Sequence, residues 1–159
     1  MSVRPLDSTL DLALRCVNSV RTVYREKNGV TQRFRTRCRQ LISLIYYSGL
    51  AYTLAYIASK AGTHVLDYAL NVSEPEKIAR QVEQAGLSEE EASYALYGAF
   101  LLTALKQIGV PGVSDAATFL DLLRKLNYPG TTLVAEGKIL RFGEWLKRLA
   151  EAVFEAERT

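Results

Sequence analysis

The sequence predicts an all-α fold, a compact bundle of about six or seven helices that forms one domain over residues 1–159. Helix-forming residues dominate the chain, and only four prolines interrupt it. Apolar residues recur at spacings of three and four positions, which places them on one face of a helix. No alternating strand pattern is present that could build a sheet. The length is sufficient to bury one core without disulfides or metals.

Three helices are expected in the first part of the chain. The first covers about residues 7–24, and the Lys-Asn-Gly run at 27–29 ends it. The second begins near Thr31, and a break or bend follows at Ser48-Gly49. The third ends at residues 61–62. The second helix carries an apolar stripe at helical spacing, made of Phe34, Cys38, Leu41 and Ile45.

The middle of the chain predicts further helices with clear start signals. Residues 64–70 are a candidate short helix. Ser73 and Ser88 are each followed three residues later by a glutamate, the spacing of a capping box. The helix that Ser88 opens is expected to run to about Ile108.

The C-terminal part predicts two more helices and one short stretch that is either a strand or a loop. Ser114 or Asp115 is expected to cap a helix that ends near Leu126. Residues 131–136 have strand character, or form a loop. The last helix is expected over about residues 138–155.

The search for catalytic and metal-binding motifs indicates that the chain is not an enzyme. There is one histidine, His64, and no nucleophile elbow, Walker loop or dinucleotide-binding glycine motif. Cys16 and Cys38 lack the spacing of a zinc site and behave as small apolar residues, with a disulfide between them left open. We expect no metal, no cofactor and no small-molecule substrate. An enzyme of unrecognised type, dependent on His64, is the weakest alternative.

One uncharged segment, residues 41–59, is long enough to cross a bilayer. Tyrosines stand at its middle, whereas a lipid-facing helix keeps its aromatic residues near its ends. A pair of buried helices broken near Gly49 therefore explains the segment better than a membrane span. The N-terminus also lacks the pattern of a signal peptide. We expect a cytoplasmic protein with no membrane partner.

Positive charge is concentrated near the N-terminus. Residues 1–48 hold nine Lys/Arg and three Asp/Glu, a net charge of +6, whereas the remainder sums to −3. A local basic excess suits a polyanionic partner, although a solubilising surface without a partner explains it equally well.

Four arginines alternate along the second predicted helix, and they are the strongest candidates for binding phosphate groups. At 100° per residue, Arg33 and Arg37 lie on one edge of the apolar stripe, and Arg35 and Arg39 lie on the other. No acidic residue occurs from 28 to 66, so no local partner neutralises them. The planar fork of arginine matches phosphate oxygens. Salt bridges to acidic residues elsewhere in the fold are the alternative.

Two segments of the sequence resemble a known family. Residues 39–50 combine a basic helix with Leu-Ile and Gly-Leu pairs, and Leu-Ala-Tyr at 54–56 and Ser-Lys at 59–60 follow. Near the C-terminus, residues 144–152 contain the run Trp-Leu-Lys-Arg. The order and separation of these segments are similar to those in the small-subunit family of Cmr (type III-B) CRISPR RNA-guided effector complexes.

The resemblance implies a non-catalytic subunit of a ribonucleoprotein. Several copies would stack side by side along its backbone filament, contact other Cmr subunits, and help to hold guide RNA and target RNA, while other subunits cleave. The residues that carry over from matching motif positions are Arg39, Lys60, Trp145, Lys147 and Arg148. The basic residues among them join the RNA-binding candidates.

Aromatic residues are the candidates for contact with protein. We expect Trp145 to be a core or interface anchor, and Tyr46 to be an interface residue. The alternative function is a helical protein–protein adaptor that makes no contact with nucleic acid, with exposed tyrosines such as Tyr46, Tyr52 or Tyr94 as its anchors.

Overall fold

The computed structural model describes residues 3–25, 28–110, 112–128 and 131–157. Within these ranges all regular structure is α-helical, which confirms the predicted fold class; there are eight helices, one more than the upper expected count. They are α1 (Ser8–Val23), α2 (Asn28–Ser48), α3 (Leu50–Ala61), α4 (His64–Asn71), α5 (Pro75–Gln84), α6 (Glu89–Ile108), α7 (Phe119–Leu126) and α8 (Thr131–Val153).

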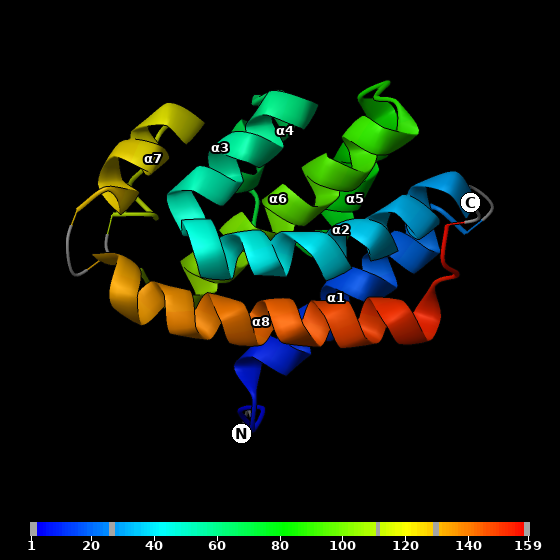
Figure 1. Ribbon diagram of the computed structural model, residues 1–159, viewed down its shortest axis with the longest axis horizontal. Helices are drawn as coiled ribbons and strands as arrows, with labels where there is room; N and C mark the ends of the chain where they lie inside the picture. The colour runs from blue at the N-terminus through cyan, green and yellow to red at the C-terminus, as the bar shows by residue number, and fades with distance from the viewer. Residues whose placement is uncertain (1–2, 26–27, 111, 129–130, 158–159) are drawn as a thin grey trace.

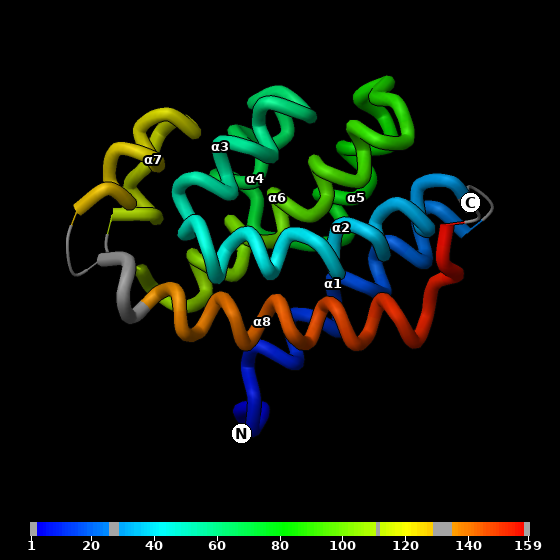
Figure 2. Tube along the Cα trace, in the orientation of Figure 1, coloured from blue at the N-terminus to red at the C-terminus, as the bar shows by residue number. Residues whose placement is uncertain are grey.

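Helix α6 is the centre of the bundle (Figures 1 and 2). Every residue from 92 to 105 is buried, as expected for a helix that is apolar on all sides. It packs against α1 to α5 and against α8. The long helix α8 runs along one edge of the molecule, beside α1 and α2 (Figure 1). Helices α1 and α2, from the N-terminal part of the chain, therefore lie next to α8 at its C-terminal end.

The predicted capping box at the start of α6 is confirmed. Glu91 N–H donates to Ser88 Oγ over 3.1 Å, and Ser88 N–H donates to Glu91 Oε1 over 3.0 Å. These backbone and side-chain hydrogen bonds to Ser88 lower the pKa of Glu91. At the other end, Gly109 adopts a left-handed conformation that ends the helix after Ile108, as expected.

The predicted break at residues 48–49 is also confirmed, and a glycine makes it. Gly49 has φ of +87°, a value that side chains with a Cβ rarely adopt. The turn separates α2 from α3 and leaves Leu50 and Leu54 fully buried. The uncharged segment 41–59 is thus a pair of packed helices. Among the described residues, no helix combines the length and apolarity needed to cross a bilayer.

The start of α7 was predicted wrongly. The helix begins at Phe119 and has Thr118 as its N-cap, whose side chain accepts from Asp121 N–H over 3.2 Å. Asp67 of α4 also accepts from Phe119 N–H over 2.8 Å. This second contact joins segments 52 residues apart, so it leaves no trace in the local pattern around Ser114 and Asp115.

Two further helix starts differ from expectation. Residues 131–136 are the first turns of α8, neither a strand nor a loop, and β-branched residues lower helix propensity only slightly. Helix α5 begins with Pro75 at its first position and Glu74 at its N-cap. Ser73 therefore precedes the cap, and the buried ring of Pro75 fixes the start instead.

Candidate nucleic-acid interface

Arg37 is withdrawn from solvent. Its exposed fraction is 8%, and Nη1 donates to Gln40 Oε1 over 2.9 Å and to Tyr94 Oη over 2.8 Å. The guanidinium carbon lies 4.3 Å from the centroid of the Tyr94 ring, a cation–π contact. Arg37 therefore stabilises the packing of α2 on α6, and it is not available to a phosphate in this conformation.

A chain of ring contacts links the buried Arg37 to the exposed Lys60. Tyr94 packs edge-on against Tyr56 of α3, with ring centroids 6.0 Å apart. The Lys60 ammonium lies 5.5 Å from the Tyr56 centroid. The pKa of Tyr94 is raised to about 12, mainly by burial and to a smaller extent by its hydrogen bond with Tyr56. Two predicted basic residues are thus joined through a pair of aromatic rings, and only Lys60 is exposed.

Arg39 and Arg148 meet on the outer surface formed by α2 and α8. Arg39 Nε lies 3.7 Å from Glu151 Oε2, and Arg148 Nη1 lies 3.8 Å from Glu151 Oε1. Arg148 Nε also lies 3.9 Å from Glu144 Oε2. More than half of each arginine side chain is exposed, so these long ion pairs contribute little to stability. The structure therefore brings together two predicted residues that are 109 positions apart in the sequence.

The remaining basic candidates are half-buried. Arg35 lies one helical turn before Arg39 on the same side of α2, and its Nε is buried without a hydrogen-bond partner among the described residues. Arg33 lies one turn before Arg37 on the other side. Lys147 lies on α8 next to Arg148. Helix α2 thus separates its arginines onto two sides, of which only the Arg39 side continues onto α8.

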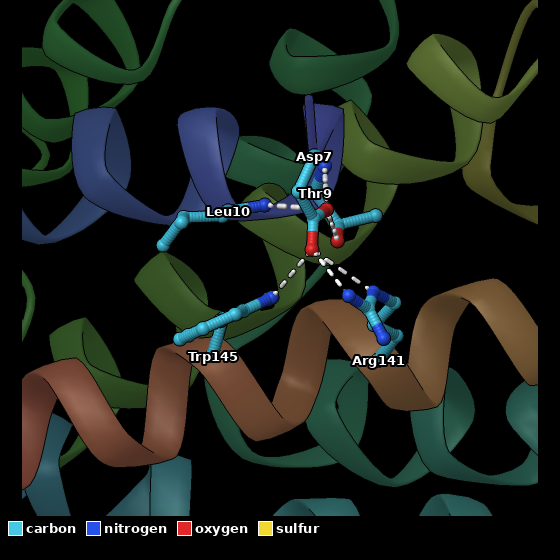
Figure 3. A network of polar contacts seen from close by, with 5 residues as sticks. All are labelled: Asp7, Thr9, Leu10, Arg141 and Trp145. Carbon is cyan, nitrogen blue, oxygen red and sulfur yellow. Dashed lines mark hydrogen bonds and ion pairs between the residues drawn. The ribbon is translucent and has the colours of Figure 1, made fainter. Parts of the chain in front are cut away.

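Trp145 fastens the N-terminus of the chain to α8 (Figure 3). Its indole N–H donates to Asp7 Oδ2 over 3.1 Å, and Arg141 donates to the same oxygen from Nε and Nη2 at 3.0 and 2.6 Å. Asp7 Oδ1 caps α1 through Thr9 and Leu10. The hydrogen bonds from Thr9 and then Arg141 hold the pKa of Asp7 well below its usual range.

This role of Asp7 was missed in the sequence, although one signal was present. An aspartate directly before Ser8-Thr9 is a recognisable N-cap. Its second partner on α8 lies 138 residues away, and no local pattern could reveal it. The structure gives the half-buried Trp145 a contact within the chain, and its prediction as a protein-interface residue stays a prediction.

Tyrosines form the most exposed aromatic surface. Tyr46 and Tyr47 at the end of α2 are 69% and 82% exposed, and their rings meet edge to face with centroids 5.0 Å apart. Tyr52 at the start of α3 is 58% exposed. By contrast, Tyr94 is buried, so it cannot serve as an anchor for a protein partner as the adaptor alternative supposed.

Cys16 and Cys38 are both buried, and no disulfide joins them. Burial raises the pKa of the Cys16 and Cys38 thiols well above the usual value, which makes them unreactive. Among the described residues, no three acidic, histidine or cysteine side chains are grouped so that they could hold a metal ion. His64 is exposed at the first position of α4.

Comparison with known proteins gives one consistent result. Residues 8–153 match the model of the family described as CRISPR-associated protein (Cas_Cmr5). A relative from Saccharolobus solfataricus, the CRISPR system CMR subunit Cmr5, is 30% identical over 149 residues, which cover 91% of this chain and 92% of the relative.

Solved structures agree with this result. The fold matches a chain of the type III-B Cmr-beta complex bound to cognate target RNA and AMPPnP, with a TM-score of 0.68 and 27% identity. It matches a chain of the same complex bound to non-cognate target RNA with the same TM-score and identity. Each match covers 96% of this chain and 100% of the other. The predicted family is confirmed, and the chain belongs to the Cmr5 family, the small subunits of type III-B Cmr complexes.

Proposed function

We propose that this chain helps to hold guide RNA and target RNA in a type III-B Cmr complex, and that it cleaves neither strand. Its partners are the other Cmr subunits, further copies of itself, and the phosphate backbones of the two RNAs. The proposal is supported by the similarity to chains in two solved complexes that contain target RNA.

The observation that carries the proposal is that Arg39 of α2 and Arg148 of α8 contact the same carboxylate, Glu151, on the surface where the two helices meet. Both arginines contact Glu151 at distances beyond a normal hydrogen bond, and both remain more than half exposed. An exposed ion pair of this kind exchanges its partner at little cost. Phosphate oxygens can therefore replace Glu151 as the partner of either guanidinium.

The proposed mechanism is electrostatic and independent of sequence. Arginines that neutralise phosphates release condensed counterions, and this release drives binding without any contact to the bases. Base pairing between guide and target supplies the specificity, while the protein recognises the backbone and the shape of the duplex. Arg35 and Lys147 are proposed to extend this basic surface, and Arg33 and Lys60 are proposed to bind phosphate on the other side of α2, near Arg37. Arg37 is left out because its guanidinium is buried against Tyr94.

Capture of the tagged chain from its native host tests the assignment. RNA sequencing and mass spectrometry of the captured material should find repeat-derived guide RNA together with other Cmr subunits. Protein partners that survive nuclease and high salt, with no RNA present, would favour the adaptor alternative. In that case the exposed Tyr46–Tyr47 pair would be the first candidate for the contact.

A further inference from the structure

Two tyrosine rings project from the C-terminal end of α2. More than two-thirds of Tyr46 and of Tyr47 is exposed, and the rings meet edge to face with centroids 5.0 Å apart. Adjacent residues of a helix point about 100° apart, so the rings meet because the two side chains lean toward each other. The pair is therefore oriented before any ligand arrives, and most of both rings is open to solvent.

The tyrosines share one solvent-facing side of α2 with an arginine of the proposed RNA surface. At 100° per residue, Arg39, Ser43 and Tyr46 fall within an arc of about 60°, and Tyr47 and Gln40 widen it to about 120°. All five side chains are exposed, and we call them the α2 strip. The strip begins with a guanidinium, continues through an amide and a hydroxyl, and ends on two aromatic rings.

The α2 strip contains no carboxylate. The sequence has no acidic residue from 28 to 66, and the arginine of the strip takes its partner, Glu151, from α8. Glu136, also on α8, lies at the α2–α3 corner, where it accepts from Leu50 N–H over 3.4 Å. It lines a pocket of about 290 Å³ that the two tyrosines of the strip do not line. A polyanion can therefore lie along the strip without meeting a negative charge on α2.

Aromatic rings beside a basic side chain are the arrangement that binds single-stranded nucleic acid. The cation neutralises phosphates, and an unpaired base stacks on a ring, which every base can do because each has a π-face. The amide of Gln40 and the hydroxyl of Ser43 can donate to or accept from ribose 2′-hydroxyl groups between these two contacts.

The surroundings of the rings favour a base over a protein partner. Among the described residues of α2 and α3, the large apolar side chains that are exposed are all tyrosines: Tyr46, Tyr47 and Tyr52. The rings therefore lack the surrounding aliphatic surface that a protein interface buries at its centre. A flat base needs only the face of a ring.

The length of the strip fits a short stretch of RNA. Arg39 and Tyr46 are seven positions apart, which is about 10.5 Å along the helix axis. A stacked strand advances about 3.4 Å per nucleotide, so a phosphate on Arg39 and a base at the tyrosines would be about three nucleotides apart. One strand can reach both ends of the strip.

We infer that the Tyr46–Tyr47 pair stacks on an unpaired nucleobase of the RNA whose phosphates Arg39 contacts. The inference rests on the proposed function and adds to it one class of ligand, a base that lies outside the duplex. Tyr47, the more exposed ring, is the stacking surface, and Tyr46 holds its orientation from the edge. Stacking tolerates every base, so sequence specificity still comes from base pairing.

Titration of the full-length chain with labelled single-stranded RNA tests the inference. Tyr47→Leu should raise the dissociation constant about tenfold, because the stacking surface is lost. Tyr47→Phe keeps the aromatic face and should bind as the wild-type chain does. Tyr52→Leu is the matched control, because Tyr52 is an exposed tyrosine on α3 outside the strip, and it should also bind normally. The salt slope should be equal for all four chains, because none of these substitutions changes a charge.

An RNA strand with abasic nucleotides connects the tyrosine to the base. Removing the bases while keeping every phosphate should weaken binding of the wild-type chain and leave no stacking for Tyr47→Leu to lose. The two chains should therefore bind the abasic strand with equal affinity. If Tyr47→Leu weakens binding to the normal and the abasic strand by the same factor, its effect does not depend on a base, and the inference is overturned.

Binding to a fully paired guide–target duplex separates this inference from the proposed function. If the chain binds the duplex and Tyr47→Leu binds single strands as the wild-type chain does, the stacking contact alone is overturned. If the chain binds single strands through Tyr47 but does not bind the duplex, the proposed function alone is contradicted. A chain that binds no RNA overturns both.

The same variant distinguishes RNA from a protein partner. Tyr46 is also the residue predicted to contact protein, so Tyr47→Leu should be captured from the native host beside the wild-type chain. If the variant keeps its affinity for RNA but loses a Cmr subunit from the captured material, the pair contacts protein, and the inference is wrong.

Discussion

The indole N–H of Trp145 donates a hydrogen bond to Asp7 Oδ2 across 3.1 Å, and this contact joins the first helix of the chain to the last (Figure 3). The same carboxylate caps α1 with its other oxygen. One side chain thus fixes both the start of α1 and the position of α1 against α8. Since α8 also carries Arg148, the N-terminal cap and the proposed RNA surface depend on the same helix.

Asp7→Asn tests this connection. Asparagine can still cap α1, but it cannot form the ion pair with Arg141. We expect the Tm at pH 7 to fall by about 2–4 °C. The fluorescence of Trp145, the only tryptophan in the chain, should shift to the red as its indole loses its acceptor. An unchanged Tm together with an unchanged emission spectrum would show that the Asp7 contacts do not form in solution.

The pH dependence of the same variant has a defined sign. Because the folded-state pKa of Asp7 is lowered, its contribution to stability is fully present above the unfolded pKa of about 4. The contribution is lost as the pH falls through the folded-state value. The difference in Tm between the wild-type chain and Asp7→Asn should therefore stay constant from about pH 5 to 8 and shrink below about pH 4. A difference that grows on acidification contradicts the account.

Arg37→Gln should reduce stability without changing the salt dependence of RNA binding. The substitution removes a buried cation–π contact and a hydrogen bond to Tyr94, and should lower the free energy of unfolding by about 1–3 kcal/mol. Urea unfolding measures this loss. Tyr94→Phe is the matched control, because it keeps the ring and removes only the hydroxyl. A decrease in the salt slope for Arg37→Gln would mean that Arg37 leaves its buried site to bind phosphate.

Two glycines in helices should respond to alanine with opposite signs. At Gly98 in α6, an added Cβ would lie 2.7 Å from Ile57 Cγ2 and 2.9 Å from Leu66 Cδ2. Gly98→Ala should therefore destabilise the chain by about 1–3 kcal/mol through overpacking. Gly137 in α8 has nothing within 4 Å of the added atom, so Gly137→Ala should stabilise by about 0.5–1 kcal/mol. Equal effects in urea unfolding would contradict the packing of α6.

Local signals predicted most of the fold. The capping box at Ser88 and the glycine at position 49 act through neighbouring residues, and both were recognised correctly. The start of α7 was missed although Thr118, its N-cap, is a local signal, and the additional contact from Asp67 of another helix has no local signal. The first turns of α8 were missed because their β-branched residues favour a strand when considered alone.

The candidate site was less accessible to sequence reasoning. Helical spacing placed Arg35 and Arg39 on one side of α2, and Arg33 and Arg37 on the other. It could not show that α6 packs over Arg37 and buries it. Burial of Arg37 depends on Tyr94, which is 57 residues away. The pocket beside Glu136 combines three distant segments, and no motif in the chain indicates it.

The salt dependence of binding to a guide–target RNA duplex tests the central claim, that the α2–α8 surface contacts phosphates through Arg39. The most direct comparison is between Arg39→Gln and Arg124→Gln, because both arginines are exposed and both are paired with a carboxylate, but Arg124 lies on α7. For Arg39→Gln, the slope of log K against log salt should decrease in magnitude by about 0.7–0.9, and Arg124→Gln should leave it unchanged. Identical slopes for the wild-type chain and Arg39→Gln would contradict the claim.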